Sequence, residues 1–221
     1  MNVTPPTVAL LFDLDGVVID TESQYSLFWH RAGADYLGMS DLEHRVKGQT
    51  LTYIYDTFFP NMAAEQAAIT ASLDRFEQQM TFDYLPGVEA FLIELRQRNM
   101  KSAVVTSSNE QKMAAVHRAH PELRSLFTRI LTAELFSRSK PAPDCFMLGM
   151  KLLGVMPQNT YVFEDSINGL KAGMASGATV VALATTHPRE AIQPLSHYII
   201  DDFNGMTYDK LIENYTFAAS N

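Results

Sequence analysis

The sequence predicts an α/β protein with a doubly wound, mostly parallel sheet and a small helical domain inserted near its start. Three observations support this fold class. A continuously apolar run at residues 8–12 leads into two aspartates, Asp13 and Asp15. From about residue 88 onward, strand-like and helix-like segments alternate. Residues 24 to about 80, in contrast, keep only helical spacing. Strict alternation is typical of a parallel sheet with helices on both faces.

The inserted domain is predicted to begin with an amphipathic helix. Thr21 and Gln24 have the spacing of a capping box, and helical spacing follows over residues 24–37. The apolar face of this helix comprises Tyr25, Phe28, Trp29, Ala32 and Tyr36.

Helical spacing continues to about Met80, and residues 81–87, which contain a Pro-Gly pair, are predicted to be the returning linker. We therefore expect two domains, a core of residues 1–20 and 82–221 and a helical cap of residues 21–81.

The remainder of the chain is predicted to build the sheet and its helices. A helix begins near Val88, and strands are expected over residues 101–106, 129–132, 161–163, 179–183 and 197–200. Further helices are expected over residues 110–119, 144–153 and 166–176. In the last of these, Gly169 and Gly173 precede Gly177 at four-residue intervals, a spacing that lets a helix approach the sheet closely.

Composition restricts the function classes. The chain has 221 residues, of which 47% are hydrophobic, enough for one large domain and one smaller one. Its formal charge of -8, from 17 basic and 25 acidic residues, argues against a nucleic-acid surface. No window has the apolar length of a membrane span, and residues 1–7 do not resemble a secretory signal. We expect a soluble cytoplasmic protein, with Cys145 as a packing residue in a reducing compartment.

The two aspartates carry the strongest functional signal. Asp13 and Asp15 follow a strand that is predicted to be buried on both faces, at the edge where parallel sheets bind ligands. Two carboxylates so close repel each other unless a cation or a transferable proton is present. The pair indicates a metal site, a nucleophile, an acid or base, or several of these. Alone, residues 13–17 also fit a turn that ends the strand.

Three later segments offer further groups suited to phosphate or a cation. Thr106 ends a predicted strand, Lys140 precedes a predicted helix within a Lys-Pro-Ala-Pro-Asp segment, and Glu164 and Asp165 follow another strand. Each segment alone has a simpler interpretation. Ser108 begins a stretch with capping-box spacing, Lys140 fits a solvated lysine, and the acid pair fits the start of a helix.

Together, an acid pair, a hydroxyl, a lysine and a second acid pair in this order resemble the haloacid dehalogenase (HAD) superfamily of phosphotransferases. Within it, the sequence is most similar to the beta-phosphoglucomutase-like group of small phosphatases and sugar-phosphate mutases. The resemblance covers roughly residues 8–200. It implies a Rossmann-like core, a helical cap and Mg²⁺ as the cofactor.

The resemblance also implies roles for the acids. Asp13 would be the nucleophile that forms an aspartyl-phosphate, and Asp15 would act first as general acid and then as general base. Asp13, the backbone carbonyl of Asp15 and Asp165 would bind Mg²⁺, with Glu164 as a further ligand, directly or through water.

Phosphate binding is assigned by resemblance to four residues. Thr106 would donate its hydroxyl to the phosphoryl group, assisted by the backbone N–H groups of Ser107 and Ser108. Lys140 would neutralise the phosphate and the charge on Asp13.

The cap residues favour hydrolysis over mutase activity. The family's mutases carry a histidine ten residues after the second aspartate, where this chain has Tyr25. They also place an arginine shortly after a Lys-Gly pair, but Lys47 and Gly48 are followed by Gln, Thr and Leu. Tyr25, Arg45 and Lys47 are the cap residues we expect near the substrate.

We therefore expect a Mg²⁺-dependent phosphatase that hydrolyses a small phosphate monoester such as a sugar phosphate. A beta-phosphoglucomutase-type mutase is the alternative, followed by an inorganic pyrophosphatase and a catalytically silent binding protein. A catalytically silent binding protein is disfavoured because a protein that serves only as a scaffold has no need of buried like charges. The expected partner is a small phosphorylated metabolite, with no nucleic acid and no membrane, and the expected state is a monomer or a weak homodimer.

Overall fold

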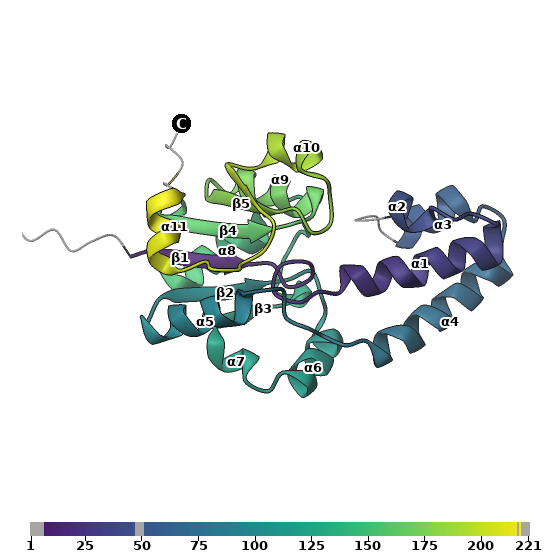
Figure 1. Ribbon diagram of the computed structural model, residues 1–221, viewed down its shortest axis with the longest axis horizontal. Coiled ribbons are helices and arrows are strands. Elements are labelled where there is room, and N and C mark those ends of the chain that lie inside the picture. Colours follow the sequence, from purple (N-terminus) through teal and green to yellow (C-terminus); the bar gives the residue numbers. More distant parts are fainter. Residues whose placement is uncertain (1–6, 47–50, 216, 218–221) are drawn as a thin grey trace, which may run out of the picture.

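The structure is a computed structural model that describes residues 7–46, 51–215 and 217. It consists of a sheet covered by helices and an elongated group of helices beside it (Figure 1). Two connections join these parts, and they run side by side. The N–H of Asp20 donates to the carbonyl of Asp83 at 2.8 Å, and the N–H of Leu85 donates to the carbonyl of Val18 at 3.0 Å.

Six parallel strands form one sheet in the order β3-β2-β1-β4-β5-β6. Their bounds are Ala9–Phe12 (β1), Lys101–Val105 (β2), Arg129–Leu131 (β3), Thr160–Glu164 (β4), Thr179–Leu183 (β5) and Tyr198–Ile200 (β6). The first strand in the sequence is therefore central, with the strand order running in opposite directions on its two sides. Open α/β sheets bind ligands at such a switch point, beyond the carboxyl ends of the strands.

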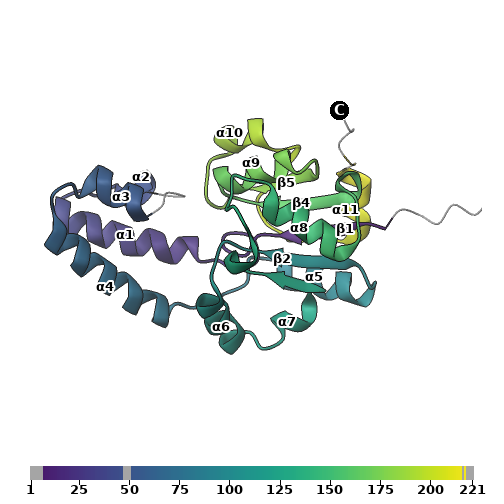
Figure 2. The same ribbon diagram turned by 180° about the vertical axis from the view of Figure 1, so that it is seen from behind.

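Helices cover both faces of the sheet (Figures 1 and 2). Leu10 and Phe12 belong to a cluster formed with α5 (Val88–Gln97), α6 (Glu110–Ala119), α7 (Leu123–Leu126) and α11 (Tyr208–Asn214). Ala9 and Leu11 belong to a second cluster with α8 (Asp144–Leu153), α9 (Ile167–Ala175) and α10 (Arg189–Ile192). Successive strand residues face opposite sides, so a strand covered on both sides must be apolar throughout. The predicted doubly wound α/β fold is confirmed.

The second part consists of α1 (Glu22–Leu37), α2 (Leu42–Val46), α3 (Leu51–Phe58) and α4 (Ala63–Gln79). These helices pack around a hydrophobic cluster of their own, with Trp29, Leu42, Phe59 and Ile69 buried in it. The helical spacing found in the sequence between residues 24 and 80 thus corresponds to helices. Tyr36, predicted to lie on the apolar face of α1, is instead exposed.

The start of α1 differs from the predicted capping box. Thr21 precedes the helix, but its hydroxyl makes no cap hydrogen bond and instead donates to Asp15 at 2.7 Å. The amide of Gln24 donates to the carbonyls of Asp20 and Thr81 and accepts from the N–H of Thr81. Thr21 therefore binds the first acidic motif, and Gln24 binds the connections between the two parts, instead of the first turn of the helix.

Among the described residues, no helix combines the length and apolar character that a membrane span requires. Cys145 lies on α8 and is fully buried in the core. Burial raises the pKa of its thiol to about 11, so the side chain is a neutral packing group.

Candidate active site

The site lies where β1, β2 and β4 end. β1 pairs with both neighbours in register, so that Phe12 lies beside Val104 on one side and Phe163 on the other. The polar residues that follow these strands consequently meet at one edge of the sheet. Asp13 and Asp165 lie in one group of carboxylates there, and Thr106 is the first residue after β2 at the same edge.

Lys140 joins two carboxylates at the centre of the site. Its ammonium donates to Asp13 Oδ1 at 2.6 Å, to Glu164 Oε1 at 2.7 Å and to the carbonyl of Val105 at 3.1 Å. The Lys140 side chain is only 6% exposed, so these three acceptors replace water around its charge. Burial opposes that charge, but the carboxylates of Asp13 and Glu164 outweigh it and raise the pKa of Lys140. The interpretation of Lys140 as a solvated lysine is therefore wrong.

Glu164 is the last residue of β4 and is completely buried. Besides Lys140, it accepts from the backbone N–H groups of Asp165 and Ser166, each at 2.9 Å, through Oε2. Gly169 leaves room for it, since a Cβ there would overlap the Glu164 carboxylate. Glu164 thus serves as a counter-ion for Lys140 and accepts hydrogen bonds at the start of α9.

Asp165 lies beside this pair and is 3% exposed. Its Oδ2 accepts a short hydrogen bond from the hydroxyl of Thr186, in the loop after β5. Gly16 packs against the same oxygen with φ of +70°, and a Cβ there would overlap the carboxylate. The glycine of the Asp-Leu-Asp-Gly segment is therefore required both for its left-handed backbone and for the close approach of Asp165.

Too much negative charge is buried here for one lysine to balance. Asp13, Glu164 and Asp165 each place a carboxylate oxygen within 4.8 Å of the others. Burial, and after it the neighbouring carboxylates, raises the pKa of Asp13 to about 7 despite Lys140. Burial and the charges of Glu164 and Asp13 raise the pKa of Asp165 as well. A group of oxygen ligands with unbalanced negative charge fits a hard divalent cation such as Mg²⁺.

Asp15 points to a different set of partners. Its Oδ1 accepts from the Thr21 hydroxyl at 2.7 Å and from Lys112 Nζ at 2.7 Å, and its Oδ2 accepts from the Ser108 hydroxyl at 2.8 Å. Burial favours the neutral carboxyl, but Lys112 and the hydrogen bonds outweigh it and lower the pKa of Asp15. The two aspartates of the first motif therefore have opposite electrostatic environments, which is the pattern of paired carboxylates with separate roles.

The segment after β2 is only partly as predicted. Thr106 is buried, and its hydroxyl oxygen accepts from the N–H of Ser108 at 3.0 Å, while Ser107 is exposed. The N-cap of α6 is Asn109, which accepts from the N–H of Lys112, so a capping role for Ser108 is wrong. Because the cap lies one residue later, the Ser108 hydroxyl is available to bind Asp15.

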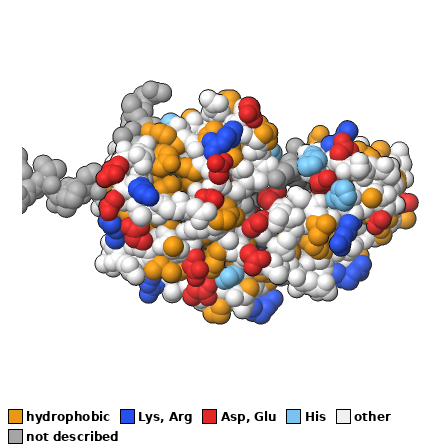
Figure 3. All heavy atoms as spheres, in the orientation of Figure 1, with side chains coloured by type: hydrophobic (Ala, Val, Ile, Leu, Met, Phe, Trp, Pro, Cys, Tyr) orange, Lys and Arg blue, Asp and Glu red, His pale blue; other side chains and the backbone are white. Residues whose placement is uncertain are grey.

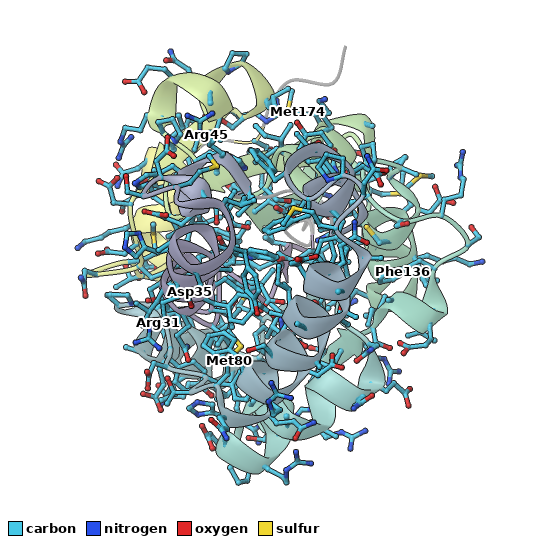
Figure 4. All side chains as sticks on the ribbon, turned by 90° about the vertical axis from the view of Figure 1, so that its right-hand side faces the viewer. Arg31, Asp35, Arg45, Met80, Phe136 and Met174 are labelled. Carbon is cyan, nitrogen blue, oxygen red and sulfur yellow. The ribbon has the colours of Figure 1, made fainter. Side chains whose placement is uncertain are left out.

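The three expected cap residues have different locations. The Tyr25 hydroxyl donates to Glu77 Oε1 at 2.8 Å, and its ring faces Lys112. Arg45 of α2 forms an exposed pair with Asp41 at 2.9 Å and lies at the edge of the helices in Figure 4. Lys47, with Gly48, lies outside the described residues.

Besides Thr21, which the sequence suggested only as a helix cap, two residues of the site were missed from the sequence. Lys112 lies three residues into a helix, where lysines are usually solvated, and no pattern marks it. Thr186 follows shortly after β5, so the rule applied to Asp13 and Asp165, a polar residue beyond a strand end, could have found it.

A cleft of about 390 Å³ lies between the two parts of the molecule beside this group. It is lined by His44 from α2 and by residues 184–188, which include Thr186. Figure 3 shows acidic side chains along the junction of the two parts. Of the residues that line it, Thr186 links the cleft to the acids through its hydrogen bond to Asp165.

Comparison with known proteins identifies the protein family. The family described as "Haloacid dehalogenase-like hydrolase" matches residues 10–183. Hexitol phosphatase A of Escherichia coli (strain K12) is 32% identical over 181 residues, which cover 78% of this chain and 81% of that protein. The phosphorylated carbohydrates phosphatase of Thermotoga maritima is 28% identical, covering 76% of this chain and 81% of that protein.

The fold is shared with solved structures. A HAD hydrolase of family IA, variant 3, from Entamoeba histolytica HM-1:IMSS superimposes with a TM-score of 0.78 at 20% identity, covering 94% of this chain and 98% of that one. The chain belongs to the haloacid dehalogenase-like hydrolases. Its family is one of hydrolases, and the relatives it matches include named phosphatases.

Proposed function

We propose that the protein is a Mg²⁺-dependent phosphatase that hydrolyses a small sugar phosphate through an aspartyl-phosphate on Asp13. The observation that carries this proposal is the buried group in which Lys140 contacts Asp13 at 2.6 Å, with Asp165 alongside. A phosphate monoester resists attack because its oxygens are negative, so the catalyst must neutralise them and align a nucleophile.

Asp13 supplies the nucleophile in this proposal. Its carboxylate attacks phosphorus, the bond to the leaving-group oxygen breaks, and a water later displaces the phosphate from Asp13. Lys140 holds one oxygen of Asp13 in place and places positive charge beside the transferring group. Thr106, Ser107 and Ser108 are proposed to bind the phosphoryl oxygens at the start of α6.

Asp13 and Asp165, with the backbone carbonyl of Asp15, are proposed to hold Mg²⁺, and Glu164 is a further candidate ligand. The bound cation would neutralise phosphoryl charge and lower the repulsion among these acids. Thr186 would orient Asp165 through its hydrogen bond.

Asp15 is proposed to donate a proton to the leaving oxygen and then to take one from the attacking water. It is two residues from Asp13 on the same turn, and its carboxylate has partners entirely different from those of Asp13. Separate partners allow the two carboxylates separate roles. In the structure the pKa of Asp13 is raised and that of Asp15 is lowered, the reverse of what a nucleophile and a general acid need. These roles therefore require that bound Mg²⁺ lower the pKa of Asp13 and that the negative phosphoryl group raise that of Asp15.

The substrate is proposed from the relatives and from the shape of the molecule. Hexitol phosphatase A and the phosphorylated carbohydrates phosphatase are named for small phosphorylated polyols and sugars. We propose that residues 21–81 act as a cap over a core of residues 1–20 and 82–221, so that the cleft between them holds the sugar. A single small sugar phosphate fits a cleft of about 390 Å³.

Mutase activity is less well supported, although Beta-phosphoglucomutase of Bacillus subtilis (strain 168) is 26% identical over 199 residues. Tyr25 occupies the position of the mutase histidine, and its hydroxyl is already bound to Glu77. A tyrosine in that state cannot accept a proton from a sugar hydroxyl as an imidazole can.

The test is a phosphate-release assay on hexitol phosphates, hexose phosphates, pyrophosphate and p-nitrophenyl phosphate, with Mg²⁺ or with EDTA. The proposal expects Mg²⁺-dependent release from a sugar or hexitol phosphate and none from the Asp13→Asn variant. Release from pyrophosphate alone would indicate a pyrophosphatase, and interconversion of hexose phosphates without release would indicate a mutase. No turnover of any substrate would contradict the proposal.

A further inference from the structure

Lys112 of α6 is bonded to the proposed acid/base group. Its Nζ lies 2.7 Å from Asp15 Oδ1, and both side chains are largely buried, with 22% and 24% of their surface exposed. The other two partners of Asp15, Thr21 and Ser108, are neutral hydroxyl groups. Among the described residues, Lys112 is the one cation in hydrogen-bond contact with Asp15.

The same lysine also contacts the helical part of the molecule. Its Nζ lies 5.6 Å from the centre of the Tyr25 ring on α1, within the range of a cation–π interaction. The Tyr25 hydroxyl donates to Glu77 on α4 at 2.8 Å. A continuous path of contacts therefore runs from Asp15 in the core, through Lys112 and Tyr25, to Glu77.

The backbone of Lys112 is fixed as well. The N–H of Lys112 is bound by the N-cap Asn109, which fixes the first turn of α6. Lys112 and Glu77 also line a groove of about 710 Å³ between α4 and α6. The position of the Lys112 ammonium thus depends on Asp15 and Tyr25, the two groups it contacts.

We propose that Lys112 is a positioning residue that fixes the carboxyl of Asp15 for proton transfer to the leaving group. This inference rests on the proposed function. A general acid must lie within hydrogen-bond reach of the leaving oxygen, and a displacement of about 1 Å can cost roughly 100-fold in rate. Thr21 and Ser108 each donate one hydrogen bond to the Asp15 carboxylate, and Lys112 donates the third, from α6.

The experiment compares two leaving groups. A sugar alkoxide needs a proton as it departs, whereas p-nitrophenolate leaves without one, so only the former depends strongly on a positioned acid. The quantity measured is kcat/KM, which reports phosphoryl transfer and not the later hydrolysis of the aspartyl-phosphate. The readout is the ratio of kcat/KM for the preferred sugar phosphate to kcat/KM for p-nitrophenyl phosphate.

The Lys112→Met variant is expected to lower this ratio by about tenfold or more, a part of the roughly 10²–10⁴-fold effect of general acid catalysis. Lys112→Arg, which keeps the charge, is expected to restore most of the ratio. Lys151→Met removes an exposed lysine from α8, and this matched control should leave the ratio unchanged. Thermal melts of all variants establish that they are folded, and Lys112→Gln replaces Lys112→Met if the latter is not.

Equal losses for both substrates in Lys112→Met would mean that the lysine only supports the fold, and would overturn the inference. An unchanged ratio would overturn it too. Either result, with an active wild-type enzyme, leaves the proposed phosphatase function intact. A wild-type enzyme that releases phosphate from neither substrate contradicts the proposed function itself and this inference with it.

Discussion

Lys140 and Asp13, 127 residues apart in the sequence, form an ion pair of 2.6 Å with both side chains largely buried. Lys140 also contacts the fully buried Glu164, so one cation faces two carboxylates, and Asp165 adds a third. Burial, and after it the excess of carboxylates over cations, raises the pKa of Asp13 and Asp165, and a bound divalent cation would offset that excess. Several measurable consequences follow from it.

Replacing Lys140 with Met should impair both stability and activity. It leaves Asp13 and Glu164 buried without their cation, and breaking a buried pair in this way costs about 3–5 kcal/mol. Urea unfolding with Mg²⁺ removed should show the loss, and phosphate release should fall at least about 100-fold. The exposed Lys151→Met variant should match the wild type in both measurements. A Lys140→Met protein as stable as the wild type would contradict the assignment of this pair.

Mg²⁺ should stabilise the protein more at pH 8 than at pH 5. Asp13 has an unfolded pKa near 3.8 and a folded pKa of about 7 without metal, so the folded state binds more protons between these values. The contribution of Asp13 to stability without metal is therefore greatest below pH 3.8 and is lost as the pH rises through about 7. Mg²⁺ competes with those protons for the carboxylates. Bound Mg²⁺ therefore offsets the stability that is lost as the pH rises. Thermal melts with Mg²⁺ or EDTA at both pH values measure this, and an equal shift at both would contradict it.

Gly16→Ala should reduce activity far more than Gly38→Ala does. Both glycines have left-handed backbones, with φ of +70° and +65°, so alanine brings similar backbone strain, of about 1–2 kcal/mol, at either position. Only at Gly16 would the new Cβ overlap another group, the Asp165 carboxylate, whereas no atom lies within 4 Å at Gly38. Gly16→Ala should therefore raise the Mg²⁺ concentration needed for half-maximal activity, and Gly38→Ala should not. Equal behaviour of the two variants would argue against a role of Asp165 in metal binding.

Thr186→Val should weaken Mg²⁺ binding without unfolding the protein. The variant keeps the volume of the side chain but removes the hydroxyl that donates to Asp165. Loss of such an orienting partner typically costs about 10- to 100-fold in metal affinity or activity. Titration of activity with Mg²⁺ measures the effect, and Thr132→Val, a buried threonine elsewhere, serves as the control. An unchanged Mg²⁺ requirement would show that the hydroxyl does not orient Asp165.

Much of this site was accessible from the sequence because strand ends are local features. An apolar run followed by an acid places Asp13 and Asp165 at the same edge of a parallel sheet, and the structure has them there. The helices at residues 110–119 and 144–153 were also predicted with the bounds that the structure has. Helix bounds and strand ends depend on residues that are neighbours in the sequence, and the spacing of apolar residues is enough to predict them.

What the sequence did not reveal depends on pairings between distant segments. Ser108 and Thr21 both had the spacing of helix caps, in which a hydroxyl accepts from a backbone N–H, but in the structure both hydroxyls donate to Asp15. Lys112 reaches the same carboxylate from a helix position that is usually solvated. Local patterns do not report which side chains the fold brings to Asp15, so these three contacts required the structure.

The most direct test of the account is to identify the residue that carries the phosphoryl group. The enzyme is mixed with its sugar phosphate and Mg²⁺, quenched in acid during turnover and reduced with borohydride, which converts an aspartyl-phosphate to homoserine. Mass spectrometry of the peptides should locate the change at Asp13, and the Asp13→Asn protein should show none. Modification at another residue, or none in an enzyme that is turning over, would contradict the assignment of Asp13 as the nucleophile.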